Sequence, residues 1–328
     1  MMKLEDSYKR VHDYLRISIT DNCNFRCTYC MPDESYEFLP PSHLMTPDEI
    51  FQLAKTFVEL GVKKIRITGG EPLVRKDFLE IMEKLSELPV ELTLTTNGVL
   101  IDKYLDDLIA MGVRSINISL DTLNPIKFHQ ITKRNQFHKV LQNIQLCLKA
   151  GILTKINVVA VKGEVEKEIH SFIHLTEIYP LHVRFIEFMP FDGNHWDSQK
   201  VLSASEMMQI AMEHYEVVKL KDEVHETARK FQVKGSKGSF AFITTMSNHF
   251  CFECNRMRIT ADGKMKNCLF DKNELDLLTP LRNNEPILSV IRESLKNKKP
   301  FLGGQFTNEF EKTDAHAIVN RSMIKIGG

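Results

Sequence analysis

Short β-rich runs alternate with longer helical patterns between residues 14 and 190, and this alternation constrains the fold more than any other feature of the sequence. Six units of this kind predict a parallel sheet covered by helices, either as an open doubly wound sheet or as a barrel. The six runs are LRISIT (15–20), KKIRITGG (63–70), VELTLTTNG (90–98), RSINISLD (114–121), TKINVVAV (154–161) and HVRFIEFM (182–189).

The alternation of side chains inside each run decides between these two architectures. In the first run Arg16 and Ser18 alternate with Leu15 and Ile17, and polar and apolar residues alternate in the later runs in the same way. A doubly wound sheet buries both faces, so its strands read as nearly continuous apolar runs. We therefore expect an α/β fold with a partial (β/α)6 TIM-like barrel, whose lumen holds a polar, charged ligand.

A turn-rich segment at residues 190–202 breaks the β/α rhythm. The chain has 328 residues, more than a single hydrophobic core of roughly 250–300 residues usually covers. We therefore expect a barrel domain at residues 1–200 and an α+β C-terminal region at residues 201–328. That region is expected to contain a helix from Ser203 to about His214, a strand over GSFAFITTM (238–246) and a helix around Pro286–Lys296.

The overall charge is balanced, with 43 basic and 43 acidic residues. No global field therefore attracts a nucleic acid or an anionic membrane. The first residues lack the apolar core and cleavage site of a secretion signal, and no run approaches the ~18 apolar residues of a membrane span. We expect a cytoplasmic protein without a nucleic-acid or membrane partner.

The first cysteine group, Cys23, Cys27 and Cys30, directly follows the first β-rich run with the spacing Cys-x3-Cys-x2-Cys. Disulfides are rare in a reducing compartment, so such a group suggests metal binding. Structural zinc needs four protein ligands, whereas three thiolates fit a [4Fe–4S] cluster with one open iron. Active sites of β/α barrels also lie at the carboxyl ends of the strands. A zinc knuckle that borrows a remote fourth ligand is the alternative.

The second cysteine group is Cys251, Cys254 and Cys268, and it also lacks an evident fourth ligand. The same argument predicts a second cluster in the C-terminal region, although His249 could close a zinc site instead. Cys147 lies alone in a helical pattern, and we expect it to be a buried structural thiol.

Basic residues lie on the polar side of several β-rich runs, and two more alternate on a short predicted strand within the second cysteine group. Burying so many cations is unfavourable unless an anion fills the lumen, and guanidinium groups match phosphate oxygens. A polyphosphate is therefore the expected ligand. Alternatively, the bases pair with acids on neighbouring strands, where Asp121 and Glu187 are nearby. The basic residues are Arg16, Lys64, Arg66, Lys155, Arg184, Arg256 and Arg258.

The segment DNCNFRCTYCMP, with its three cysteines, resembles the signature of the radical S-adenosylmethionine (SAM) superfamily. The turn Gly69-Gly70-Glu71-Pro72 is similar to the glycine-rich turn of that superfamily. The resemblance implies that the open iron chelates SAM and that one electron cleaves it to a 5′-deoxyadenosyl radical, so that the cofactors carry the chemistry. It also implies SAM contacts from Tyr29, Gly70, Ser119 and Met189.

The first cysteine segment together with CFECNRMRITADGKMKNCL and the terminal Ile326-Gly327-Gly328 resembles the GTP 3′,8-cyclase family, whose members begin molybdenum cofactor biosynthesis. This resemblance covers nearly the whole chain. It implies a lyase that uses SAM and two [4Fe–4S] clusters, the second of which holds the guanine of GTP. The GTP contacts that it implies are Arg16, Arg66, Thr95, Lys155, Arg184, Arg256, the Met257 backbone and Arg258.

In this family the radical removes the 3′ hydrogen of GTP, and the ribose carbon attacks guanine C8 to give (8S)-3′,8-cyclo-7,8-dihydro-GTP. The Gly-Gly tail is expected to reach the active site. The implied partners are an electron donor, the cyclic pyranopterin synthase that acts next in the pathway and, as an open case, a second copy in a homodimer. No role is assigned to residues 222–238 or 286–300.

Two other functions stay open at this level. One is a different radical SAM enzyme with an auxiliary cluster, such as a peptide-modifying maturase, although such enzymes usually carry more C-terminal cysteines. The other is a structural zinc module or RNA-binding module, against which the neutral net charge argues.

Overall fold

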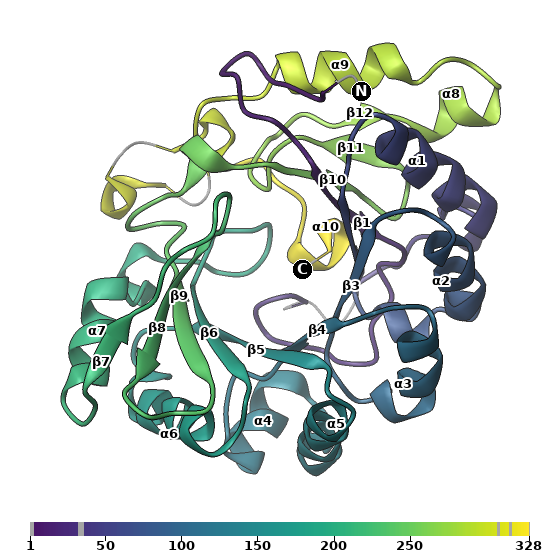
Figure 1. Ribbon diagram of the computed structural model, residues 1–328. Coiled ribbons are helices and arrows are strands. Elements are labelled where there is room, and N and C mark those ends of the chain that lie inside the picture. The colour runs from purple at the N-terminus through teal and green to yellow at the C-terminus, as the bar shows by residue number, and fades with distance from the viewer. Residues whose placement is uncertain (1–2, 32–35, 307–308, 315–316, 328) are drawn as a thin grey trace.

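The computed structural model describes residues 3–31, 36–306, 309–314 and 317–327. Within these residues the strands form one sheet in the order β12-β11-β10-β1-β2-β3-β4-β5-β6-β9-β8-β7 (Figure 1). The strands are β1 (Tyr14–Ser18), β2 (Lys64–Thr68), β3 (Glu91–Thr96), β4 (Ser115–Ser119), β5 (Leu153–Ala160), β6 (His182–Glu187), β7 (Val217–Lys219), β8 (Ala228–Val233), β9 (Ser239–Ile243), β10 (Arg256–Ile259), β11 (Lys264–Lys266) and β12 (Leu275–Asp276).

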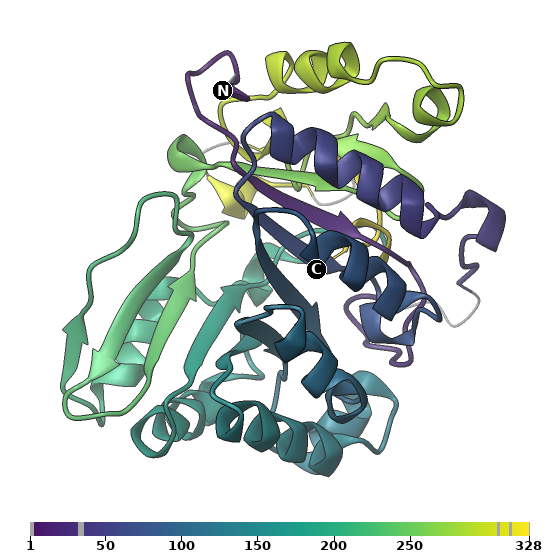
Figure 2. The ribbon, with the colours of Figure 1, turned by 45° about the vertical axis from the view of Figure 1, so that its right-hand side comes forward.

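Helices cover the outer face of the curved sheet, and the C-terminal segment lies inside the curve (Figures 1 and 2). The six predicted β-rich runs become the parallel neighbours β1 to β6, so the predicted partial barrel is confirmed. The helices are α1 (Pro47–Glu59), α2 (Phe78–Ser86), α3 (Ile101–Ala110), α4 (Pro125–Thr132), α5 (Phe137–Lys149), α6 (Glu166–Ile178), α7 (Ala204–Met212), α8 (Leu278–Arg282), α9 (Leu288–Lys296) and α10 (Met323–Ile326).

Strands from the C-terminal region extend the barrel sheet at both edges. β9 pairs in parallel with β6, and β10 pairs in parallel with β1. In the described part of the chain β7 and β12 end the sheet, so hydrogen bonds do not close the barrel. The sequence predicted β9 and β10 as strands but not these pairings. The division into domains at residue 200 stays a prediction.

The alternation in the strands separates an apolar outer face from a polar lumen. Leu15 and Ile17 of β1 are almost fully buried and belong to the main hydrophobic core, which also includes Phe57 of α1. The parallel register places Arg16 directly beside Arg258 on one side and Arg66 on the other. Three guanidinium groups therefore occupy one row across neighbouring strands.

Local sequence signals explain where two of the helices begin. Thr46 and Glu49 form a reciprocal capping box at the start of α1, and Ser203 and Glu206 form another at the start of α7. The predicted start at Ser203 is thus confirmed. Cys147 lies fully buried in α5, as expected. Among the described residues, no helix is long and apolar enough to cross a membrane.

Asn143 of α5 supports the loop that follows β3. Its buried amide nitrogen donates to the carbonyl oxygens of Gly98 at 2.7 Å and Val99 at 2.9 Å. Asn143→Ala leaves these acceptors without a donor, which should cost about 1–3 kcal/mol of stability. We expect a lower midpoint of thermal unfolding, whereas Gln142→Ala on the exposed side of α5 should leave it nearly unchanged. Equal midpoints for both variants would contradict this role.

Candidate active site

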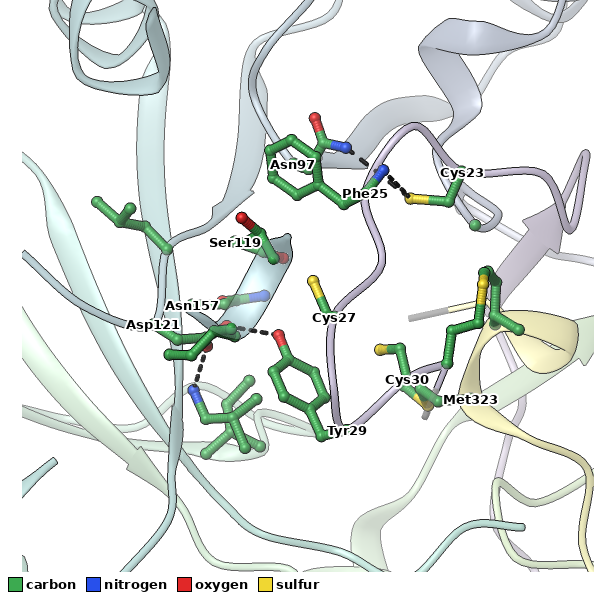
Figure 3. Close-up of a pocket in the computed structure, with 18 of the residues that line it drawn as sticks. Cys23, Phe25, Cys27, Tyr29, Cys30, Asn97, Ser119, Asp121, Asn157 and Met323 are labelled. Carbon is green, nitrogen blue, oxygen red and sulfur yellow. Dashed lines mark hydrogen bonds between the residues drawn. The ribbon is translucent and has the colours of Figure 1, made fainter. Parts of the chain in front are cut away.

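The first cysteine group lines a cavity at the carboxyl ends of the barrel strands (Figure 3). Cys23, Cys27 and Cys30 lie in the loop after β1, where Phe25 donates its backbone N–H to the Cys23 sulfur at 3.4 Å. Burial raises the pKa of all three thiols. The thiols therefore stay neutral until a positive metal centre stabilises the thiolate forms, as expected of metal ligands.

The Gly69-Gly70 turn after β2 packs directly against the cysteine loop. The Gly70 N–H donates to the Thr20 carbonyl at 2.7 Å, which brings the two backbones together. A Cβ atom on Gly70 would lie 2.5 Å from the Asn22 carbonyl oxygen and 2.6 Å from that of Asp21. Only glycine allows this approach, so the turn and the cysteine loop form one unit at the rim of the cavity.

Glu71 fastens the same turn to the end of β3. Its buried carboxyl group accepts from the Thr96 hydroxyl at 2.8 Å and from the Asn97 backbone N–H at 2.6 Å. Burial raises the pKa of Glu71 to about 7, partly offset by these hydrogen bonds. Asn97 in turn donates to the side chain of Asn24 in the cysteine loop at 2.6 Å. The sequence analysis assigned no role to Asn97, because nothing local marks its contact with the loop.

All four residues predicted to contact SAM line this first cavity: Tyr29, Gly70, Ser119 and Met189. The Tyr29 hydroxyl donates to Asp121 at 2.5 Å, and Asp121 also accepts from the Val159 N–H at 2.8 Å (Figure 3). Asp121 thus fixes the tyrosine ring between the cysteine loop and the end of β4.

The second cysteine group lines a separate cavity of about 440 Å³, within the usual range for ligand pockets of about 300–1,000 Å³. Cys251 begins the 3-10 helix η4 (Cys251–Glu253), and its sulfur accepts from the Leu302 N–H at 3.5 Å. Burial alone would raise the pKa of Cys254, but nearby cations outweigh burial and lower the pKa to about 6. Burial raises the pKa of Cys251 to about 11, so within this group it is Cys254 that lies in a strongly positive environment.

The predicted cations gather around this second cavity. Thr95 instead lines the first cavity, where its hydroxyl accepts from Arg66 at 3.3 Å. The Met257 side chain lies in the hydrophobic core, so only the Met257 backbone is left for the predicted contact. The cations lining the second cavity are Arg16, Lys64, Arg66, Lys155, Arg184, Arg256 and Arg258.

Electrostatic repulsion and burial act together on these cations. Burial, and then repulsion from neighbours led by Arg184, lowers the pKa of Lys155 to about 7. Burial also lowers the pKa of Arg184 and Arg258 to about 10. The Nε atoms of Arg184, Arg256 and Arg258 are buried and have no hydrogen-bond partner among the described residues. These donors are therefore available to an anion.

The alternative, pairing of these bases with acids on neighbouring strands, is found for Lys64, which pairs with Glu91 of β3 at 2.7 Å. It is not found with Asp121 or Glu187 in the described structure. Asp121 accepts from Tyr29 and Val159, as described above. Glu187 accepts from the Met246 N–H at 2.7 Å and from the Ser247 N–H at 3.0 Å. Both carboxyl groups are thus engaged outside the cationic lumen.

The two cavities adjoin, because Asn157, Ile186, Met189 and Met323 line both of them. Met323 lies in α10, and Gly327 just after it lines the second cavity. The C-terminal segment therefore lies in the lumen beside both cysteine groups. Gly328, the last residue of the predicted Gly-Gly tail, lies outside the described residues.

A loop that the sequence analysis left without a role also borders the second cavity, at residues 223–227 between β7 and β8. His225 in this loop contacts the Glu253 carbonyl next to the second cysteine group at 2.8 Å. Glu226 lies in the cationic cavity and pairs with Lys230 at 2.6 Å. The contact of His225 with Glu253 joins residues 28 positions apart, so no local pattern could reveal it.

The spread of the sulfur atoms distinguishes a cluster from a single zinc ion. Tetrahedral zinc with Zn–S bonds of about 2.3 Å brings its sulfur ligands to about 3.8 Å from one another. Among the described residues, the one group of three such ligand atoms within 4.8 Å of one another is His170, Glu213 and His214, on the surface. Among the described residues neither cysteine group, even with His249, brings three ligand atoms that close together, so neither is arranged as a tetrahedral zinc site.

Comparison with known proteins identifies the family. Residues 17–176 match the Radical SAM superfamily, and residues 181–302 match Molybdenum Cofactor Synthesis C. The chain is 43% identical to the mitochondrial GTP 3′,8-cyclase of Arabidopsis thaliana over 99% of its own length and 83% of the relative. It is 38% identical to the GTP 3′,8-cyclase of Alkaliphilus oremlandii, over 99% of this chain and 100% of that one. The chain belongs to the GTP 3′,8-cyclase family.

Members of this family also occur as part of larger proteins. The chain is 46% identical to Molybdenum cofactor biosynthesis protein 1 of Bos taurus over 98% of its length, but it spans only about half (51%) of that relative. Among solved structures, the fold resembles Streptococcus suis SuiB bound to S-adenosylmethionine, with a TM-score of 0.61, 16% identity, and 87% and 69% of the two chains covered. This likeness concerns the fold alone.

Gly70→Ala tests whether the glycine turn holds the cysteine loop. The new Cβ atom must push the loop away from the turn, so we expect loss of most iron from the first group with little change in the circular dichroism of the fold. Iron analysis after reconstitution measures this. Gly163→Asn is the control, because nothing lies within 4 Å of a Cβ atom there and asparagine tolerates its positive φ. A Gly70→Ala protein with full iron content would contradict the predicted role.

Proposed function

We propose that this chain is a radical SAM lyase that converts GTP into (8S)-3′,8-cyclo-7,8-dihydro-GTP, the first step of molybdenum cofactor biosynthesis. The observation that carries this proposal is the meeting of two cavities in one lumen, each with its own group of three cysteines. Relatives named GTP 3′,8-cyclase that match along their full or nearly full length support it.

The first cavity is the proposed site of SAM. Cys23, Cys27 and Cys30 would hold a [4Fe–4S] cluster, which together with SAM supplies a 5′-deoxyadenosyl radical. The chain's own residues bind and orient the cofactor. Gly70 lets the turn after β2 pack against the cysteine loop, and Tyr29, fixed by Asp121, forms one wall.

The second cavity is the proposed site of GTP, with Cys251, Cys254 and Cys268 holding a second [4Fe–4S] cluster at one end. Guanidinium groups recognise phosphate oxygens through paired hydrogen bonds, and the unpartnered Nε atoms of Arg184 and Arg258 would bind the triphosphate. A triphosphate would also relieve the repulsion among these cations. The guanine base would then lie toward the second cysteine group.

The shared wall of the two cavities suits the proposed reaction. It would hold the ribose between the SAM site and the second cluster, so that the 3′ carbon meets both the radical and guanine C8. Fixing reacting atoms in one geometry is the largest contribution that such a scaffold makes. Buried hydrophobic residues such as Phe188 and Trp196 beside the first cavity would help to exclude water.

A peptide-modifying maturase is the second candidate function. Streptococcus suis SuiB in complex with precursor peptide SuiA has a similar fold, with a TM-score of 0.61 at 15% identity over 97% and 67% of the two chains. That likeness concerns the fold alone and supports no peptide substrate for this chain. The strongly cationic lumen favours a small polyanion over a peptide.

Further parts of the proposal have other grounds. An electron donor and a downstream cyclic pyranopterin synthase rest on the family resemblance, whereas a cytoplasmic location and the division of the chain at residue 200 rest on the sequence patterns described above. A homodimer is also compatible with the family resemblance.

Metal content together with nucleotide dependence tests the proposed function. After anaerobic reconstitution we expect about eight irons per chain, because each cubane holds four. With SAM and dithionite, 5′-deoxyadenosine should then form far faster with GTP than with ATP. About four irons with one zinc would remove the second cluster, and equal rates with ATP and GTP would overturn the assignment of the substrate.

Lys155 should take up a proton when GTP binds. Its pKa of about 7 in the free protein is low because of burial and of repulsion led by Arg184, and a bound triphosphate would raise it again. The proton on Lys155 contributes fully to GTP affinity below about pH 7. This contribution is lost as the pH rises through the pKa that Lys155 has in the GTP complex. Calorimetry at pH 8 in two buffers of different ionisation enthalpy should therefore show uptake of about one proton.

Lys155→Arg is the matched variant for this measurement, since arginine keeps the charge but stays protonated in both states. Proton uptake should fall toward zero while GTP still binds. The same uptake in both proteins would mean that another group titrates.

A further inference from the structure

Lys298 is a buried cation behind the second cysteine group, in the segment 286–300 to which the sequence analysis assigned no role. It follows α9 and is only 3% exposed. Its Nζ atom lies 3.7 Å from the Cys254 sulfur. The contact joins two residues 44 positions apart, so the fold and not the local chain brings them together.

The contacts of Nζ indicate a charged ammonium group. Besides the Cys254 sulfur, Nζ lies 2.8 Å from His12 Nε2 and 3.1 Å from the Arg256 carbonyl oxygen. An ammonium group can donate to all three of these atoms when the imidazole nitrogen carries no proton.

No carboxylate in the described part of the chain lies within ion-pair distance of Lys298. The nearest acid in its network is Asp6, but Asp6 pairs with Arg10 at 2.6 Å. Lys266, which is similarly buried, is neutralised by a carboxylate, because it pairs with Glu274 at 3.2 Å. A buried charge without a counter-ion is strongly unfavourable, so Lys298 requires a negative group other than a carboxylate of the described residues.

A bound triphosphate cannot supply this charge. The cations proposed to bind phosphate line the second cavity, whereas Lys298 is not among the residues lining it. Among the described residues lining that cavity, Lys298 contacts the Cys254 sulfur and the neutral carbonyl oxygen of Arg256, and of these two the sulfur can become negative. The negative group facing Lys298 is therefore the thiolate of Cys254 and the cluster that the thiolate would hold.

We propose that Lys298 is the buried counter-ion of the second iron–sulfur cluster and raises the reduction potential of that cluster relative to the first. The inference rests on the proposed second cluster and goes beyond it. A positive charge and an N–H···S hydrogen bond both stabilise the more negative, reduced form of a cluster. In the first cysteine group the described donors to a sulfur are neutral, namely the Phe25 N–H and the Asn97 amide. The nearby Arg26 donates to backbone carbonyl oxygens instead of a sulfur.

Lys298→Met tests the inference, since methionine has a similar length without the charge. Dithionite supplies the electron in a redox titration of the anaerobic holoprotein, followed by electron paramagnetic resonance. We expect at least a tenfold fall in the reduced-to-oxidised ratio of the second cluster at a given potential, a shift of about 59 mV for one electron. The first cluster in the same chain is the internal reference and should not shift.

Two further variants separate charge from structure. Lys298→Arg keeps the charge and should restore the potential of the second cluster, even if Lys298→Met loses that cluster. Lys296→Met removes an exposed lysine from the end of α9 and should leave both clusters unchanged.

The outcomes separate this inference from the proposed function. A wild-type protein with only four irons would overturn the second cluster and with it the function. With eight irons, an unchanged potential in Lys298→Met would overturn the inference alone. Equal shifts of both clusters, or a Lys298→Arg protein that behaves like Lys298→Met, would also overturn it.

Discussion

Mutual repulsion among the cations of the lumen is the constraint on which the rest of the structure depends. The register places Arg258, Arg16 and Arg66 side by side on three parallel strands, with Lys155 and Arg184 on the opposite side of the same cavity. A fold gains no stability from such an arrangement, and neighbouring like charges weaken it. The arrangement is a preorganised anion site, because the free protein already holds the cations close together and a bound anion removes their repulsion.

The polarity of the lumen also explains why the C-terminal region joins the barrel sheet. β10 carries Arg256 and Arg258 and pairs with β1, so that the second cysteine group lies beside the first strand of the barrel. β9 pairs with β6 and continues the sheet on the other side of the barrel. The two ends of the sheet thus bring residues more than 200 positions apart into one cavity, and α10 returns the chain into it (Figure 1).

The parts of this arrangement that follow from short-range patterns could be predicted from the sequence. Period-two alternation around Arg16 gave the lumen side of the strands, and the spacing of Cys23, Cys27 and Cys30 indicated a cluster. The pairing of β10 with β1, the support of Tyr29 by Asp121 and the contact of Lys298 with Cys254 could not be predicted. Each depends on tertiary packing between distant segments, which leaves no local signal in the chain.

The central claim is that this lumen holds GTP with its 3′ carbon facing the SAM site. GTP deuterated only at the ribose 3′ position tests it most directly, with mass spectrometry of the 5′-deoxyadenosine formed in a single turnover. We predict that one deuterium moves from the ribose 3′ position into 5′-deoxyadenosine. Unlabelled 5′-deoxyadenosine, formed while the deuterium stays in the nucleotide product, would contradict it.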